Sequence, residues 1–285
     1  MTETRSATQD LAQHAEREPA FMDVLCAVDG TWRSYVAVEQ AAVLAGQGGE
    51  LTLLAVTAAT GSGPYRSAAI AHTRAKLILH HASGLARKAG VRSTSVIDPA
   101  TPPARVIIER AAAHDLVALG APAMSWLGEA IVGGVATEAL GPVPTALLFA
   151  RRSPSEAGFA KRILVASDGL EDSERLVGRA SQLAQAQQAD VVLLHAIDGE
   201  SRAQTDRVRE QARALETASG CSYEVRIQDG QPWDAIARTA ADAGVSLIVM
   251  GTRRLSGIRA IGSVSRRVVH DAPCSVLLIP PDGPG

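Results

Sequence analysis

The chain is predicted to be an α/β protein made of two similar halves, each a parallel β-sheet covered by helices on both faces. Short apolar runs of strand length alternate with longer segments whose apolar residues recur at helical spacing. Most of the short runs are apolar throughout, as are strands buried on both faces. The same order of elements occurs twice within 285 residues, a length that exceeds a typical single domain. Two domains are therefore expected.

The first half carries the complete series of expected elements. In order, these are a strand at 23–28, a helix at 33–47, a strand at 51–56, a helix from about 66 to 88, a strand at 91–97, a helix from Pro102 to about His114, a strand at 116–119, a short helix near 135–140 and a strand at 145–149. The strand at 91–97 alternates polar and apolar residues, which is typical of an edge strand. Pro102-Pro103 suits the first turn of a helix, where a missing N–H costs nothing.

The second half repeats the strand sequences of the first. DVLCAVDG is echoed by RILVASDG, so that Asp29 matches Asp168, and LVALG is echoed by LIVMG, so that Gly120 matches Gly251. GELTLLAV and VPTALLF are echoed by ADVVLLHA and APCSVLLI. The offset is 139 residues at the aspartates but 131 at the glycines, and we assign the eight extra residues of the first half to its long helix. A period of this length indicates duplicated domains rather than a solenoid.

Composition divides the chain into four segments. We expect a polar tail at 1–20, a first domain at 21–150, a linker at 151–158 and a second domain at 159–281. The linker RRSPSEAG is polar and contains Pro and Gly. The tail lacks the apolar centre of a signal peptide, and no apolar run reaches the roughly 18 residues that a membrane helix needs. A cytoplasmic protein without membrane contact is therefore expected.

The balance of residue types argues against several classes of partner. Lys and Arg number 28 against 30 Asp and Glu, so there is no positive charge excess to attract nucleic acid or an anionic membrane. Aromatic residues make up only 3%, which argues against stacking on single-stranded bases. Cys26, Cys221 and Cys274 have no base placed beside them by sequence, so free thiols in a reducing compartment are expected.

The stretch from Leu247 to Val269 carries the strongest functional signal. A buried strand ends at Gly251, and Gly262-Ser263-Val264-Ser265 opens a helix. Glycine lets the backbone approach a ligand closely, and the free N–H groups at a helix start point at a bound anion. This pattern predicts a phosphate site, although a serine at a helix start can also serve only as an N-cap.

The expected topology favours the phosphate interpretation in the second half. Ligands of parallel sheets bind beyond the carboxyl ends of the strands, where the strand order reverses. If the first and fourth strands are neighbours at that point, Asp168 and Gly251 share one crevice. An aspartate after a strand can instead belong to a turn or a helix cap, and this alternative stays open for Asp29 and Asp168.

Together these residues resemble the universal stress protein family in its tandem two-domain form, over about residues 21–280. The resemblance rests on the two strand-one aspartates, the glycine after strand four, the Gly-Ser-Val-Ser helix start and the final APCSVLLIP. It implies Rossmann-like (adenine nucleotide alpha hydrolase-like) domains with parallel five-stranded sheets of order 3-2-1-4-5. It also implies that the two domains pair through their fifth strands within the chain, with a homodimer possible, and that the ligand is ATP accompanied by Mg²⁺.

The nucleotide-binding branch of this family carries Gly, two residues, Gly, nine residues, then Gly and Ser or Thr. In the second half Arg254 replaces the second glycine, and only seven residues separate it from Gly262. The arginine could contact a triphosphate or could fold into the crevice and fill it. The resemblance assigns phosphate contacts to Gly251, Gly262, Ser263 and Ser265, charge neutralisation to Arg254 and the ribose to Asp168. It also places Ala166, Ile197, Met250 and Val264 in this pocket.

The first half keeps the spacing of the motif but loses its hydroxyl groups. Ala123 replaces the second glycine, and Gly134 and Ala136 replace the hydroxyl-bearing residues. We therefore expect a degenerate site there, of which Asp29, Gly120 and Gly133 remain. The function implied for the whole chain is an ATP-binding stress-response or regulatory protein that binds through its C-terminal domain.

Two other functions are alternatives to this hypothesis. The chain could be a nucleotide-free dimerisation or interaction module, or an adenylate-forming enzyme, but Ser167 to Ser173 lacks the paired glycines of the pyrophosphate loop. No general base for hydrolysis is visible, so we expect no catalysis, or at most very slow ATP hydrolysis. His72, His80 and His81 lack the spacing of a helical metal site, so no metal site made by the protein alone is expected. His195 either borders an adenine pocket or is a satisfied histidine at the end of a strand.

Overall fold

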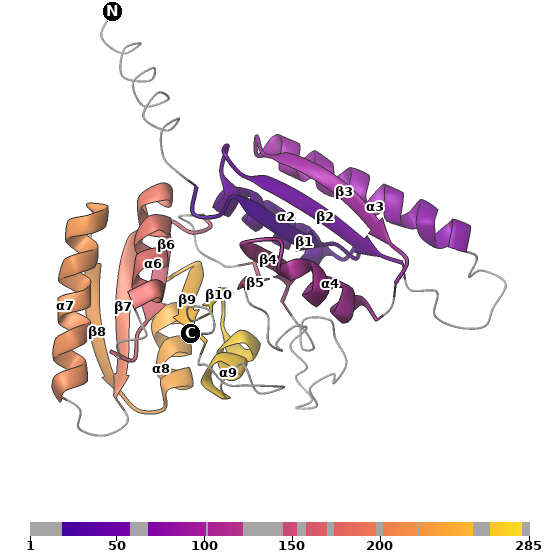
Figure 1. The fold of residues 1–285 in the computed structure, drawn as a ribbon. Coiled ribbons are helices and arrows are strands. Elements are labelled where there is room, and N and C mark those ends of the chain that lie inside the picture. Colours follow the sequence, from indigo (N-terminus) through magenta and orange to yellow (C-terminus); the bar gives the residue numbers. More distant parts are fainter. Residues whose placement is uncertain are drawn as a thin grey trace, which may run out of the picture.

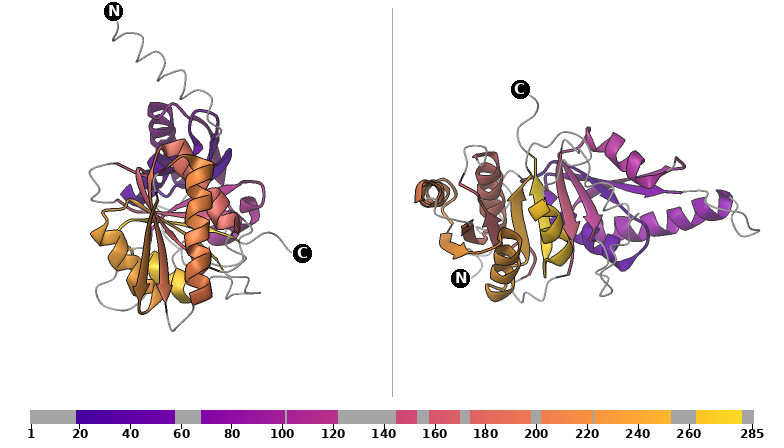
Figure 2. Two further views of the ribbon diagram at one scale, coloured as in Figure 1. Left: turned by 90° about the vertical axis from the view of Figure 1, so that its left-hand side faces the viewer. Right: turned by 90° about the horizontal axis from the view of Figure 1, so that it is seen from below.

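The computed structural model describes residues 19–57, 68–100, 102–121, 145–152, 158–169, 174–197, 202–221, 223–252 and 263–280, and all structural statements refer to these residues. They form one ten-stranded sheet with helices on both faces (Figure 1 and Figure 2). The strand order is β3-β2-β1-β4-β5-β10-β9-β6-β7-β8. Each half therefore has the expected order 3-2-1-4-5, and the fold class predicted from the sequence is confirmed.

The elements of the two halves alternate between strand and helix in the same way. The first half contains β1 (Asp23–Ala27), α2 (Trp32–Ala45), β2 (Glu50–Val56), α3 (Ala68–Lys88), β3 (Arg92–Asp98), α4 (Pro103–Ala111), β4 (Leu116–Gly120) and β5 (Ala146–Ala150). The second contains β6 (Arg162–Ala166), α6 (Glu174–Gln187), β7 (Asp190–Ile197), α7 (Arg202–Ser219), β8 (Tyr223–Asp229), α8 (Pro232–Asp242), β9 (Leu247–Gly251), α9 (Ser263–Asp271) and β10 (Ser275–Ile279).

Local sequence signals explain where several helices begin and end. Thr31 is the N-cap of α2, with its hydroxyl accepting from the N–H of Ser34 at 3.4 Å. The helix ends at Gly46, which adopts a φ of +57° and donates its N–H to the Ala42 carbonyl. Pro103 and Pro232 begin α4 and α8, where the fixed φ of proline suits the first turn.

Two expectations about the elements need correction. The helix α4 ends at Ala111, so the expected boundary near His114 was too long by less than one turn. The extra residues of the first half do not lie mainly in its long helix, because α3 has 21 residues and its counterpart α7 has 18. Most of the excess lies in the connection between β2 and α3. The short helix expected near 135–140 lies outside the described residues.

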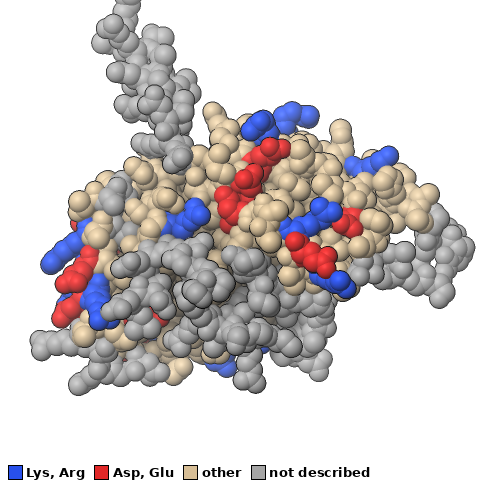
Figure 3. Space-filling view, in the orientation of Figure 1, with Lys and Arg blue, Asp and Glu red and all other residues tan. Residues whose placement is uncertain are grey.

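The expected edge strand is confirmed, since β3 and β8 are the two outer strands of the sheet. The outer strand β8 carries Glu224, which pairs with Arg226 at 2.7 Å and with Arg162 of β6 at 3.4 Å. Charged side chains on an outer strand oppose pairing with another chain. On the face in Figure 3, basic and acidic side chains of the described residues are interspersed. No described helix combines the length and apolar character that crossing a membrane requires.

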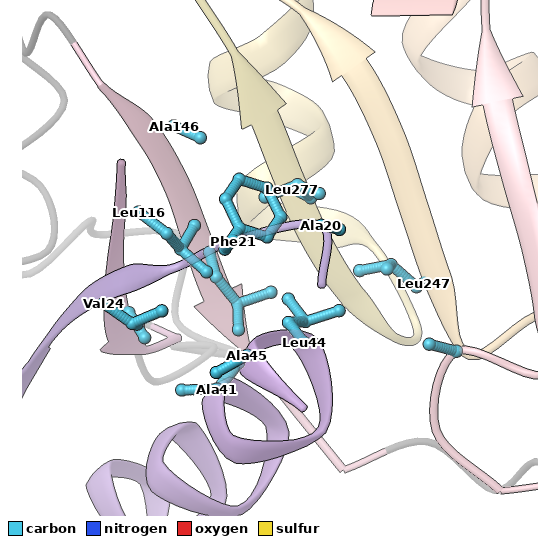
Figure 4. Close-up of a cluster of buried hydrophobic side chains, with 14 of the residues drawn as sticks. Ala20, Phe21, Val24, Ala41, Leu44, Ala45, Leu116, Ala146, Leu247 and Leu277 are labelled. Atoms are coloured by element: carbon cyan, nitrogen blue, oxygen red, sulfur yellow. The ribbon is translucent and has the colours of Figure 1, made fainter. Parts of the chain in front are cut away.

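The two halves share one core across an antiparallel seam between β5 and β10. Leu148 lies opposite Leu277 in this seam, and all other strand pairs are parallel. One buried cluster spans it, with Phe21 and Leu44 from the first half and Leu247 and Leu277 from the second (Figure 4). Helices α2, α3, α6 and α7 cover this face, whereas α4, α8 and α9 cover the other. The pairing through fifth strands that the resemblance implied is thus found within one chain.

Candidate functional site

The candidate site of the second half lies at the carboxyl ends of β6 and β9. These strands are parallel neighbours, and Ala166 pairs with Met250 in their register. Asp168 and Gly251 follow these paired residues, so both lie at the same edge of the sheet. The strand order reverses here, because β6 has β7 on one side and β9 on the other. The expectation that strands one and four are neighbours at the switch point is confirmed.

Helix α9 begins at this same edge. It connects β9 to β10, and these strands are parallel, so α9 must start at the carboxyl end of β9 and run back. Ser263, Val264 and Ser265 form its first turn. The side chain of Ser263 is exposed, whereas Ser265 is only 4% exposed. The free N–H groups of this turn therefore face the region beyond Gly251, as an anion site requires.

The remaining assigned residues have varied environments. Met250 is buried between β6 and β10, and Ala166 is half-buried and packs against the core beneath α8 and α9. Ile197 ends β7, is half-buried and accepts a hydrogen bond from Gly230 N–H at 3.1 Å. Asp168 is exposed. Arg254, Gly262 and Gly133 lie outside the described residues, so the structure leaves the two expectations for Arg254 as predictions.

The crevice of the first half is packed closely at the glycine that ends β4. A methyl group added to Gly120 would lie 2.9 Å from the backbone carbon and from Cβ of Arg33 in the first turn of α2. Glycine is therefore needed here so that α2 can pack against the strand end. For the matching Gly251, the nearest described atom to such a methyl group is Leu176 Cδ2, at 4.0 Å.

Asp29 of the first half is engaged in its own turn. Its Oδ1 accepts hydrogen bonds from the N–H of Thr31 at 2.8 Å and from the Thr31 hydroxyl at 2.7 Å. Burial alone would raise the pKa of the Asp29 carboxyl, but hydrogen bonds from Thr31 and Ser34 outweigh it and the pKa lies below its ordinary value. The structure therefore shows Asp29 in a turn that leads into α2, whose N-cap is Thr31.

A buried polar cluster distinguishes the second half. The hydroxyl of Ser167 donates to Gln211 Oε1 of α7 at 2.8 Å and accepts from Gly169 N–H at 3.2 Å. His195 is 3% exposed, and its Nδ1 lies 2.9 Å from the Ser167 carbonyl oxygen. Its Nε2 is buried and has no hydrogen-bond partner among the described residues. The histidine is therefore only half satisfied, which neither of the two interpretations from sequence stated.

The hydrogen bond between Nδ1 of His195 and the Ser167 carbonyl determines whether Nε2 donates or accepts a hydrogen bond. Because a carbonyl oxygen only accepts, Nδ1 carries the proton, and Nε2 of the neutral ring is left as an acceptor. A buried acceptor without a partner suits a water molecule or a ligand that donates a hydrogen bond. The matching positions of the first half are Val28 and Ala55, both buried and apolar. Of the two matching pairs of positions, only Ser167 and His195 of the second half are therefore polar.

Sequence reasoning missed Ser167 and Gln211 as members of this cluster. The repeat contained a signal for Ser167, since it replaces Val28 where both strand ends are buried. Gln211 gave no signal, because a polar residue on a helix is usually solvated. No group of three or more His, Cys, Asp or Glu side chains suited to a metal ion occurs among the described residues. Cys26 and Cys274 are buried free thiols, and burial raises the pKa of each to about 12.

Two parallel five-stranded units, each with a point where the strand order reverses and joined through their fifth strands, define a tandem α/β protein of the Rossmann-like class. The universal stress protein family matches the chain twice, at residues 20–151 and 160–280. The chain belongs to the universal stress protein family, with two of its domains in tandem.

Relatives of both one and two domains resemble this chain. A protein of Thermus aquaticus, described as the universal stress protein in the QAH/OAS sulfhydrylase 3' region, is 34% identical over 137 residues, 42% of this chain and 98% of the relative. Universal stress protein YxiE of Bacillus subtilis (strain 168) is 29% identical over 144 residues, 41% of this chain and 97% of the relative. The crystal structure of a universal stress protein from Archaeoglobus fulgidus superposes with a TM-score of 0.78 at 19% identity, over 93% of this chain and 98% of that one. This last likeness shows the shared fold.

Proposed function

We propose that this universal stress protein binds one adenine nucleotide per chain, in the crevice of its second half, and acts as a regulatory protein of the cytoplasmic stress response. The observation that carries this proposal is the placement of three features at one edge of the sheet. These are Asp168 after β6, Gly251 at the end of β9 and the first turn of α9. That edge is where parallel sheets bind their ligands.

The residues of the second half fit a nucleotide with phosphates. The N–H groups of the first turn of α9 and the hydroxyls of Ser263 and Ser265 would bind the phosphate oxygens. Gly251 leaves room for the backbone to approach them, and Asp168, which is exposed, would bind the ribose. Nε2 of His195 is a buried acceptor that has no partner among the described residues, and it lies at this end of the half. Arg254 and Gly262 remain expected members of the loop.

Features of the first half support a stoichiometry of one nucleotide per chain. Arg33 packs onto Gly120, and the Asp29 carboxylate is occupied by Thr31. The hydroxyl-bearing residues of the motif are replaced there by Gly134 and Ala136. We therefore propose that the first half does not bind nucleotide and that it serves as a structural partner of the second.

Binding rather than turnover is the proposed activity. A bound triphosphate would bring Mg²⁺, which neutralises phosphate charge, and the described residues contain no metal cluster of their own. Asp168 is assigned to the ribose and the sequence motif supplies no general base for water, so hydrolysis is expected to be slow or absent. Homodimers are a further expectation, and they would need a surface other than the β5–β10 seam.

Calorimetric titration of the whole chain with Mg-ATP tests the proposal. We expect binding with a stoichiometry near one, together with a rise in the thermal unfolding midpoint. The double variant Ser263→Ala/Ser265→Ala should abolish binding, while the unfolding midpoint without ligand shows whether the chain remains folded. Thr217→Ala, which removes an exposed hydroxyl of α7 that donates to the Arg213 carbonyl, is the matched control and should bind normally.

Two results would contradict the proposed function. One is the absence of both heat and thermal stabilisation at millimolar ATP, because a ligand at 100 times its Kd stabilises a fold by about 2.7 kcal/mol. The other is unchanged binding by the double serine variant. A purified chain without adenine absorbance and without any response to ATP would favour a nucleotide-free interaction module.

A further inference from the structure

The far end of α9 is held by a residue of the first half. Arg151 follows β5, and its guanidinium donates hydrogen bonds to three carbonyl oxygens at the end of α9. The acceptors are Ala272, Val269 at 3.2 Å and His270 at 3.3 Å. These carbonyls lack partners within the helix, and the helix dipole makes this end negative. A cation there stabilises the helix end both by donating hydrogen bonds and by its charge. Burial lowers the pKa of Arg151 from its ordinary value, although the group stays protonated.

The backbone of Arg151 is anchored in the seam between the halves. Its N–H donates to Ser275 Oγ of β10 at 2.9 Å, and its carbonyl accepts from Gln40 Nε2 of α2 at 2.9 Å. The Ser275 hydroxyl lies 2.7 Å from Gln40 Oε1 and 2.9 Å from the Arg151 carbonyl oxygen, so its single proton serves one of them at a time. Gln40 and Ser275 are both buried. Arg151 therefore does not behave as the first residue of a free linker.

The clamp made by Arg151 has no counterpart at the matching position of the second half. The seam relates Arg151 to Pro280, which has no side-chain donor. The second half does contact a helix end of the first elsewhere, since Gln187 of α6 donates to the Val43 carbonyl of α2 at 3.0 Å. Gln40 corresponds to Arg179 of α6, which donates to the Ala20 carbonyl at 2.9 Å and lies over the Phe21 ring. Both halves thus contribute a long polar side chain to the seam, but only Arg151 reaches a helix that begins at a candidate site.

We infer that Arg151 is a positioning residue for the nucleotide site of the second half, an inference that rests on the proposed function. The helix α9 has nine residues and is therefore about 13 Å long, short enough to move as one piece. Its first turn would hold the phosphates, and its last carbonyls are clamped by Arg151. The first half, which has no working crevice of its own, sets the place and tilt of the helix that forms the crevice of the second.

Other contacts also hold α9 in place, but they act at its sides rather than at its end. Val268 and Val269 bury one side of the helix, and Arg267 stacks over the Trp233 ring of α8 with 4.8 Å to its centroid. These contacts fix how the helix lies on the sheet, and the hydrogen bonds from Arg151 add a directional restraint at its end. Loss of the guanidinium would leave the carbonyls buried without a partner, and α9 would shift to recover solvent. Such a shift moves Ser263 and Ser265 away from the phosphates.

Two variants of the whole chain separate positioning from general stability. Arg151→Met keeps the length of the side chain and removes the clamp, whereas Arg179→Met removes the matching seam contact without touching α9. We expect Arg151→Met to weaken Mg-ATP binding by about 5- to 100-fold, the usual range of coupling between sites. Arg179→Met should lower the unfolding midpoint but leave the Kd within about twofold. Arg151→Lys restores the cation without the planar fork, and its Kd should fall between wild type and Arg151→Met.

Hydrogen exchange of the ligand-free chain supplies a second measurement. The amides of α9 should exchange faster in Arg151→Met than in wild type or Arg179→Met, while those of α8 stay unchanged.

Equal Mg-ATP affinity in wild type and Arg151→Met would overturn the inference and leave the proposed function standing. So would an equal loss of affinity in both methionine variants. If the wild-type chain binds no nucleotide, the proposed function fails and the inference falls with it. If Arg151→Met does not fold, Arg151→Lys with an unchanged Kd and unchanged exchange overturns the inference.

Discussion

The two halves share one strand order but differ at the ends of their first and fourth strands. In the first half, α2 packs onto Gly120, and Asp29 is used to begin that helix. In the second half, the buried Ser167 and His195 make a polar cluster, and the described atoms near Gly251 leave more space. Strand cores were thus kept apolar in both copies, while the crevice residues diverged. The difference shows that the buried strand residues stayed similar in the two copies, whereas the residues at the strand ends changed.

The largest expected effect comes from the seam that joins the two halves. Leu277 of β10 is 1% exposed and lies opposite Leu148 of β5. Leu277→Lys would bury an unpaired charge in the shared core and should lower the free energy of unfolding by about 4 kcal/mol or more. Leu77→Lys on α3 is the matched control, because Leu77 is 67% exposed. Its effect should stay within about 0.5 kcal/mol.

Urea unfolding followed by circular dichroism measures both variants. A continuous sheet predicts that Leu277→Lys shifts the transition of the whole chain. Halves that were stable alone would instead show one shifted transition and one unchanged transition. That outcome would show that the two halves unfold independently of each other.

A smaller effect is expected from the two glycines that end the fourth strands. Gly120→Ala forces a methyl group to within 2.9 Å of the Arg33 backbone and should cost about 1–3 kcal/mol of unfolding free energy. Gly251→Ala meets no described atom closer than 4.0 Å, so its cost should be lower and its main effect should be weaker Mg-ATP binding. Chemical denaturation and calorimetry measure the two quantities. Equal stability losses in the two variants would show that the crevices are packed alike.

The smallest expected effect is a difference between Asp29 and Asp168 in how their contributions to stability depend on pH. Because the pKa of Asp29 lies below its ordinary value of 3.8 in the folded chain, its contribution to stability is complete above that value. The contribution is lost as the pH falls through the lower, folded pKa. Asp29→Ala should therefore cost about 1 kcal/mol at pH 6, and the difference from wild type should shrink in acid.

Asp168→Ala provides the comparison for that titration. Its side chain is exposed, so we expect a stability loss below about 0.5 kcal/mol together with weaker nucleotide binding. Unfolding free energies measured at several pH values decide the matter. A cost for Asp29→Ala that does not change with pH would assign its role to packing rather than to the charged carboxylate.

Sequence patterns predicted the fold well because its signals are local and repeated. Buried strands such as Leu247–Gly251 are apolar throughout, and the doubled aspartate and glycine marked the two copies. The bounds of α3 were also predicted closely, as about 66 to 88 against the observed Ala68–Lys88. The eight extra residues of the first half were misassigned to this helix, because the repeat gives only their total between the aspartate and the glycine and not the segment that contains them.

The candidate site could be outlined from the sequence only where its residues follow the family motif. Asp168, Gly251 and the start of α9 could be placed from spacing and strand order, whereas Arg151 could not. Its polar neighbours in sequence suggested a solvated linker, yet it contacts Ala272, 121 residues away. Contacts of that separation leave no local pattern, because the partners are backbone carbonyls that every residue possesses. The same holds for Gln211, whose partner is set by the packing of α7.

The seam within one polypeptide also removes a constraint on sequence change. In a pair of identical subunits, a mutation alters both sides of the two-fold axis at once, so a residue must suit both of its environments. Here the position of Gln40 is taken by Arg179 in the second half, and the position of Arg151 is taken by Pro280. Each half of the chain can therefore accept changes at the seam that the other half would not tolerate, and the two divergent halves always occur in a one-to-one ratio.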